Sequence, residues 1–161
     1  MIMTKKIIKN SATLFGLGKK VKAPGTIGTL ATIPFVMGLG TLGPVGYMSV
    51  TFALVLWAIL ASELYEQEKG GHDHPEIIID EVVGFLVTMT WLPMTWQALA
   101  AGFILFRILD IFKPFPIGYL DKKVQGGFGV VVDDVAAGII ASILLQIVYT
   151  QTPWLGAQLA Q

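Results

Sequence analysis

Long apolar stretches alternate with short polar ones along this chain of 161 residues. Residues 45–61 are apolar on all sides, which predicts a helix that is buried or faces lipid rather than an amphipathic one. Residues 135–149 have the same character, and their small side chains favour close packing against a neighbouring helix. Another helix is expected from Ile27 to about Gly40, with Thr26 as its cap.

The apolar run from Val82 to Phe106 is long enough for one membrane span, but Pro93 interrupts it. A single span would place Asp80 and Asp110 on opposite faces of the membrane. We therefore predict two short helices joined by a hairpin at residues 91–97, each shorter than the roughly 20 residues of a full span. The expected fold is all-α, a compact multi-helix membrane bundle with short hairpin helices and one polar end.

Charge is segregated along the chain although the formal net charge is zero. Every Lys, Arg, Asp and Glu lies within residues 5–22, 63–81 or 107–134. Only 14% of residues are charged, against about 25% in soluble domains. Because Lys and Arg occur only in these blocks, the positive-inside rule places all three on the cytoplasmic side. We expect a multi-pass protein of the cytoplasmic (inner) membrane.

The length suits a single domain over residues 1–161. Within it we expect a basic N-terminal arm (1–22), a helical core (23–150) and a tail (151–161). The arm is interpreted as an amphipathic or irregular segment against the surface, with disorder as the alternative for residues 1–10, and not as a signal peptide. The absence of cysteine excludes disulfides, thiolate catalysis and Cys-ligated zinc.

Acidic residues flank the apolar segments at their cytoplasmic ends. Two doublets are expected at helix starts, and a further acid lies in the segment RILDIFKP: Asp80, Glu81, Asp110, Asp133 and Asp134. N-terminal capping would explain one such acid. Two doublets and a fifth acid exceed what capping requires, and carboxylate oxygens without His or Cys suit Mg²⁺ or Mn²⁺ better than zinc.

Basic side chains and glycines accompany these acids. Arg107 and Asp110 share a helical face, so Arg107 is either a phosphate ligand or part of a salt-bridged helix end. Lys113 is the better phosphate ligand, since Pro114 is expected to hold its backbone extended. The segment 23–29 forms a weak candidate anion cradle at a helix start, with Thr26, Gly28 and Thr29. The roles of His72 and His74 stay open, because exposed loop histidines more often face solvent.

Four ordered motifs carry a family resemblance: GTIGTL, IIIDEVVG, FRILDIFKPFPIGYLD and GGFGVVVDDVAAG. From about Phe15 to Ala141, the chain resembles the phosphatidylglycerophosphatase A family. The resemblance implies a membrane-associated, Mg²⁺-dependent lipid phosphatase. Such an enzyme removes the terminal phosphomonoester of phosphatidylglycerophosphate and leaves phosphatidylglycerol. It does not settle whether a carboxylate or water attacks.

The resulting hypothesis assigns roles to the polar residues. Four acids are expected to hold Mg²⁺: Asp80, Glu81, Asp133 and Asp134. Asp110 is a further ligand or the base that positions water. Lys113 and Arg107 neutralise the phosphoryl oxygens, helped by Thr26, Gly28 and Thr29. The partners are the lipid substrate and the bilayer, and no nucleic acid is expected. The alternatives are a phosphatase for another lipid or soluble phosphomonoester, and a small membrane cation transporter component.

Overall fold

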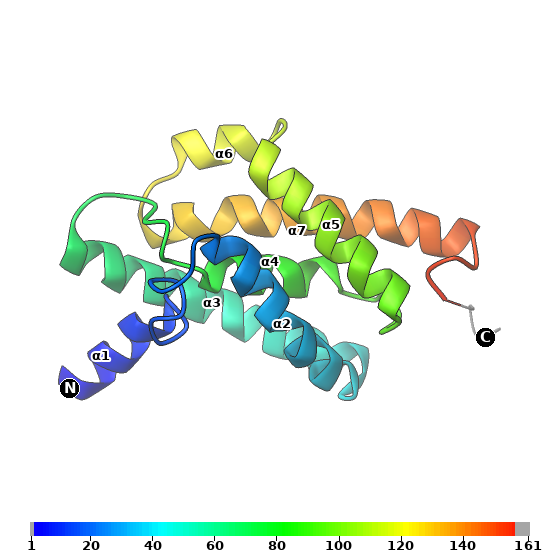
Figure 1. Cartoon of the computed structure of the whole chain (residues 1–161), viewed down its shortest axis with the longest axis horizontal. Helices are drawn as coiled ribbons and strands as arrows, with labels where there is room; N and C mark the ends of the chain where they lie inside the picture. The colour runs from blue at the N-terminus through cyan, green and yellow to red at the C-terminus, as the bar shows by residue number, and fades with distance from the viewer. Residues whose placement is uncertain (1, 157–161) are drawn as a thin grey trace.

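The computed structural model describes residues 2–156, with side chains from residue 6 onward, and residues 157–161 of the predicted tail lie outside this range. The described chain is an all-helical bundle, which confirms the predicted fold class (Figure 1). Its helices are α1 (Ile2–Ser11), α2 (Pro24–Gly40), α3 (Gly43–Lys69), α4 (Ile79–Thr88), α5 (Trp96–Phe112), α6 (Ile117–Lys123) and α7 (Gly126–Gln151).

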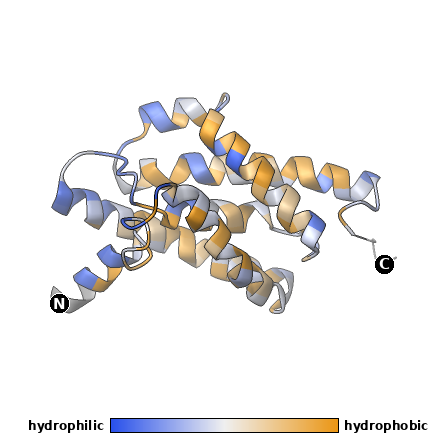
Figure 2. Cartoon of the chain, in the orientation of Figure 1, coloured by the Kyte–Doolittle hydropathy of each residue, from blue (hydrophilic) through white to orange (hydrophobic). Residues whose placement is uncertain are grey.

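Two helices of the described chain, α3 and α7, are long and apolar enough to cross a membrane. The polar end of α3 continues the helix beyond its apolar part, until Gly70 ends it with a φ of 75° that glycine adopts without strain. Colouring by hydropathy places most of the polar residues at one end of the bundle, on the left in Figure 2.

Helix α7 begins at Gly126, so the prediction of a start at Val135 was wrong. The first turns contain glycines and β-branched residues, which have low helix propensity. Tertiary contacts override that propensity: Val130 and Val131 are buried, and the Glu63 carboxylate accepts a hydrogen bond of 2.6 Å from the Gly127 amide. Asp133 and Asp134 therefore lie inside α7 rather than at a helix start.

At Gly127 the backbones of α3 and α7 touch. A Cβ atom at this position would lie 2.2 Å from the carbonyl oxygen of Ile59 and 2.4 Å from the amide nitrogen of Glu63. No side chain fits in that space. The two long helices thus cross in direct backbone contact at the polar end of the bundle.

The predicted hairpin is present, with its turn at residues 89–95 rather than 91–97. Thr95 caps α5 by accepting a hydrogen bond from the Ala98 amide, and its hydroxyl donates to the carbonyl of Leu155 at 2.5 Å. Helix α4 is the inner arm and packs against α2, α3, α5 and α7. Phe85 on α4 faces Phe106 on α5 in the apolar core, with 6.3 Å between ring centroids.

The polar end differs from the sequence prediction at two places, the Thr26 cap and helix α6. The predicted Thr26 cap was wrong: α2 begins at Pro24, whose fixed φ suits the first helical position, and Ala23 occupies the cap position without a side-chain bond. The short helix α6 was not predicted. The basic arm begins with helix α1, in which Ile8 packs on the core while Ile7 is exposed.

Candidate active site

Three carboxylates from two helices converge at the polar end of the bundle. Asp80 and Glu81 lie in the first turn of α4, where the helix dipole favours negative charge, and Asp134 lies on α7. Each offers one oxygen, and the three oxygens lie within 4.8 Å of one another. Asp134 is only 3% exposed and Asp80 only 7%. We call these three residues the acidic cluster.

The acidic cluster has unused hydrogen-bonding capacity. One buried oxygen of each carboxylate has no hydrogen-bond partner in the described structure: Asp80 Oδ1, Glu81 Oε2 and Asp134 Oδ2. Leaving buried polar atoms unpaired is costly. A divalent cation with a preference for oxygen ligands would satisfy all three at once, so the arrangement suits a metal ion.

The burial and closeness of these carboxyl groups raise the pKa values of Asp80 and Glu81 in the first turn of α4. Burial raises the pKa of Asp80 to about 6, and the charges of Asp133, Asp110 and Asp73 add to this effect while a hydrogen bond with Glu81 opposes it. Burial also raises the pKa of Glu81 well above its usual range, with Asp80 as a further cause. A bound cation would favour the ionised form of both groups.

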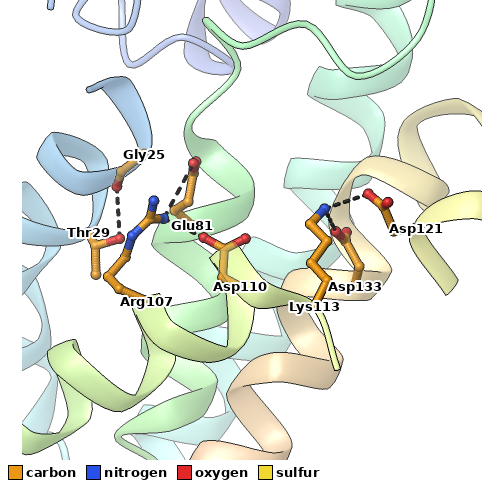
Figure 3. Close-up of polar contacts among 8 residues, drawn as sticks. All are labelled: Gly25, Thr29, Glu81, Arg107, Asp110, Lys113, Asp121 and Asp133. Carbon is orange, nitrogen blue, oxygen red and sulfur yellow. Dashed lines mark hydrogen bonds and ion pairs between the residues drawn. The ribbon is translucent and has the colours of Figure 1, made fainter. Parts of the chain in front are cut away.

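Arg107 and Asp110 on α5 border the acidic cluster. Their side chains are hydrogen-bonded to each other, as their spacing on one helical face predicted. The Nη1 atom of Arg107 also lies 3.8 Å from Oε1 of Glu81 (Figure 3). Its Nε atom is buried without a partner in the described structure. The hairpin thus brings a basic and an acidic side chain of α5 beside the carboxylates of α4.

Lys113 links α5, α6 and α7. Its ammonium group donates hydrogen bonds to Asp121 and, at 2.5 Å, to Asp133 (Figure 3). Burial lowers the pKa of Lys113, but the hydrogen bonds and charges of the two aspartates outweigh burial and raise it above its ordinary value. The expected extended backbone was wrong, because Lys113 ends α5 in the left-handed conformation with φ 44° and ψ 55°.

Asp133 therefore binds Lys113 and is not part of the acidic cluster. Adjacent residues on a helix point about 100° apart, so Asp133 and Asp134 serve different neighbours. Asp110 is likewise outside the cluster of three, although its charge acts on both Asp80 and Glu81.

The predicted anion cradle at the start of α2 contacts the site through Gly25, a residue that the sequence analysis did not single out. The Thr29 hydroxyl is fully buried and donates to the Gly25 carbonyl at 2.9 Å, while Gly28 packs against Ile78. Thr26 is half-buried in the first turn of α2.

Gly25 itself touches the site: a Cβ there would lie 2.1 Å from Glu81 Oε1 and 2.9 Å from Arg107 Nη1. Its position beside Pro24 at a helix start was the only sequence signal.

The loop that carries His72 and His74 lies near the acidic cluster, but the imidazole rings of both histidines make polar contacts within the loop and with α3. His72 Nδ1 lies 2.8 Å from Oε1 of the buried Glu66, which also accepts the Asp73 amide at 2.6 Å. His74 Nε2 lies 2.7 Å from the carbonyl oxygen of Gly70. These contacts fix the loop whose Asp73 charge acts on Asp80.

Known proteins resemble this chain over most of its length. The family model described as Phosphatidylglycerophosphatase A matches residues 10–149. A phosphatidylglycerophosphatase A from Escherichia coli is 39% identical over 132 residues, which cover 81% of this chain and 77% of the relative. One from Haemophilus influenzae is 41% identical over 133 residues, covering 81% and 82%.

A third relative, from Bacteroides thetaiotaomicron, has the provisional name phosphatidylinositol-3-phosphatase. It is 32% identical over 150 residues, covering 84% of this chain and 89% of its own length. No solved structure matches the chain significantly.

Proposed function

The chain belongs to the phosphatidylglycerophosphatase A family, and we propose that it hydrolyses the terminal phosphomonoester of phosphatidylglycerophosphate, giving phosphatidylglycerol and phosphate. The observation that supports this most directly is the buried acidic cluster with its three unpaired oxygens beside Arg107. Phosphoryl transfer depends mainly on positioning and charge stabilisation, which such a site can supply.

We assign the acidic cluster to Mg²⁺, with Asp80, Glu81 and Asp134 as ligands. Oxygen-only donors favour hard cations over zinc. When bound, the ion would neutralise phosphoryl oxygens and make water a better nucleophile. Asp110 borders the cluster and is proposed to orient the attacking water or to complete the ligand set. Asp133 is proposed to act through Lys113, which it holds in place.

Positive groups are proposed to receive the phosphoryl oxygens. The buried Nε of Arg107 is a donor without a partner in the described structure, and Lys113 contributes a second positive charge nearby. At the start of α2 the first intrahelical bond runs from the Ile27 amide to the Ala23 carbonyl, so the amides of Gly25 and Thr26 precede the helical ladder. Such amides bind anions well. In this proposal Thr29 and Gly28 support the start of α2.

The site is proposed to lie at headgroup depth on the cytoplasmic side of the inner membrane. Asp134 and Gln151 are separated by about 26 Å along α7 at 1.5 Å per residue, close to one hydrocarbon thickness of about 30 Å. Exposed tryptophans, which favour membrane interfaces, lie around the hairpin turn and after α7: Trp91, Trp96 and Trp154. The lysine-rich blocks lie towards the other end, and the positive-inside rule assigns that end to the cytoplasm.

Phosphate release from phosphatidylglycerophosphate by the purified protein tests the proposal. We expect release with Mg²⁺ and none after chelation with EDTA. Phosphatidylinositol 3-phosphate serves as the competing substrate, because one relative carries that name, and we expect it to be hydrolysed more slowly. Absence of release from phosphatidylglycerophosphate in the presence of Mg²⁺ would reject the function, and release that survives EDTA would reject the metal assignment.

A further inference from the structure

An exposed apolar surface lies where α5 turns into α6. Four large side chains at this corner are 63%, 77%, 86% and 57% exposed, in the order Ile111, Phe112, Phe115 and Tyr119. We call these four residues the aromatic corner. Helix α6 has only seven residues and cannot cross a membrane, so the corner is not part of a span. Clustered exposed apolar side chains of this kind indicate a contact surface.

The aromatic corner continues an apolar stripe on α5. Ile104 and Ile108 are also exposed, and together with Ile111 they recur at the spacing of one helical face. Arg107 and Asp110 lie on the same helix but are largely buried toward the acidic cluster. The outer side of α5 is therefore apolar up to its end, and the surface extends from there to Phe115.

Basic residues border the aromatic corner. Lys122 and Lys123 lie in the last turn of α6 and are exposed, whereas Ile117 at its start is fully buried and fixes the helix to the bundle. Exposed aromatic side chains beside lysines are typical of segments that lie in the headgroup region of a bilayer containing anionic lipids.

We propose that the aromatic corner is an interfacial anchor that inserts into the lipid surface next to the acidic cluster. The anchor is connected to the site by ion pairs: Asp121 on α6 binds Lys113, and Lys113 binds Asp133, the neighbour of Asp134. Insertion of the corner would therefore hold α6, Lys113 and the nearby part of α7 at a fixed depth. A second copy of the chain is the competing partner for the same surface.

Spin labelling can measure the depth of the corner directly, since the chain contains no cysteine. Phe115→Cys, carrying a nitroxide in phosphatidylserine-containing vesicles, is expected to be more accessible to oxygen than to a water-soluble nickel complex. Ile104→Cys is the control for a lipid-facing position. Lys20→Cys, in the exposed part of the basic arm, is the control for a water-facing position. If Phe115→Cys fails to fold, Phe112→Cys replaces it.

If the label at residue 115 were as accessible to the nickel complex as the label at residue 20, the proposal would be overturned. Dipolar broadening between labels on two chains would overturn it in favour of a second copy. Neither readout requires enzymatic activity, so the result stands even if the proposed function fails.

An activity comparison tests the connection to the site and rests on the proposed function. Phe115→Ser combined with Tyr119→Ser is expected to lose activity toward substrate in vesicles. Activity toward a short-chain, water-soluble phosphatidylglycerophosphate is expected to stay at the wild-type level. Leu42→Ser, an exposed apolar position between α2 and α3, is the matched control and is expected to keep both activities. Equal loss on both substrates, or no loss on vesicles, would contradict the connection.

Discussion

Arg107 on α5 and Glu81 on α4 approach each other to 3.8 Å, although they lie near opposite ends of the apolar run that separates them in sequence. In one continuous helix these two positions would be about 39 Å apart. The contact therefore excludes a single kinked span and requires the hairpin. It also places the polar ends of both arms on one side of the bundle, which the proposed mechanism needs.

Asp134→Asn is expected to lower phosphatase activity by about 100-fold or more, since loss of a residue that only supports a metal ligand already costs about 10–100-fold. Without metal, the variant should melt at a higher temperature than wild type, because a neutral amide replaces a carboxyl group that is buried beside two others and would be ionised in the unfolded chain at neutral pH. The Mg²⁺-induced increase in melting temperature should disappear. Glu68→Gln, an exposed carboxylate, serves as the control and should behave like wild type. Full activity in Asp134→Asn would remove it from the ligand set.

Gly25→Ala is expected to reduce activity strongly with little change in melting temperature. Its Cβ would collide with the ends of the Glu81 and Arg107 side chains, which can move away but then leave their positions in the site. Gly38→Ala on the same helix is the matched control, because a Cβ there meets nothing within 4 Å. It should stabilise the protein by about 0.5–1 kcal/mol and leave turnover unchanged. Equal activities of the two variants would contradict a role for Gly25 in the site.

Metal affinity should depend on pH through Asp80. Its carboxyl group has a pKa of about 6 in the folded protein, against an ordinary value of 3.8, so between these two pH values the metal-free folded state binds a proton that the unfolded chain has released. Stability of the metal-free protein should therefore fall as the pH rises from about 4 to about 6. Because Mg²⁺ requires the ionised carboxylate, its effect on melting temperature should grow over the same interval. Melting curves at pH 5 and pH 7.5, with Mg²⁺ or EDTA, measure both trends. A Mg²⁺ effect that is equal at the two pH values would contradict the assignment of Asp80.

Lys113→Met should destabilise the protein by about 2 kcal/mol, since Asp133 would stay buried without its partner. For a chain of this length that corresponds to a decrease in melting temperature of about 4–8 °C. The apparent KM for phosphatidylglycerophosphate should also increase if the ammonium group contacts the phosphate. Lys123→Met removes an exposed lysine nearby and is expected to change neither quantity. Identical melting temperatures for the two variants would argue against a structural role of the Lys113 bridge.

The sequence predicted the hairpin because charge segregation constrains topology. Pro93 marked the interruption, and Asp80 and Asp110 could share a side only if the chain reversed there. The start of α7 could not be predicted in the same way, since Gly126 and the residues after it have low helix propensity. Contacts with Ile59 and Glu63 on another helix make that segment helical, and such contacts are invisible in a local sequence window.

The composition of the site was only partly predictable. Carboxylates of the right kind were identifiable, but the separation of Asp133 from Asp134 depends on helical phase and on Lys113. The predicted start of α7 at Val135 left both aspartates outside the helix, so their directions around its axis could not be compared. Gly25 was missed for a related reason, because a glycine without a side chain shows its role only when its neighbours are placed around it.

The backbone contact at Gly127 has a consequence for substrate entry. Helices α3 and α7 meet there with no space for a Cβ, and the Glu63 carboxylate holds the Gly127 amide at 2.6 Å. Neither helix can slide or rotate past the other without breaking this crossing. We therefore expect α7 to form a stationary wall that carries Asp134. Substrate would then have to reach Asp134 from a side of the bundle other than the crossing of α3 and α7.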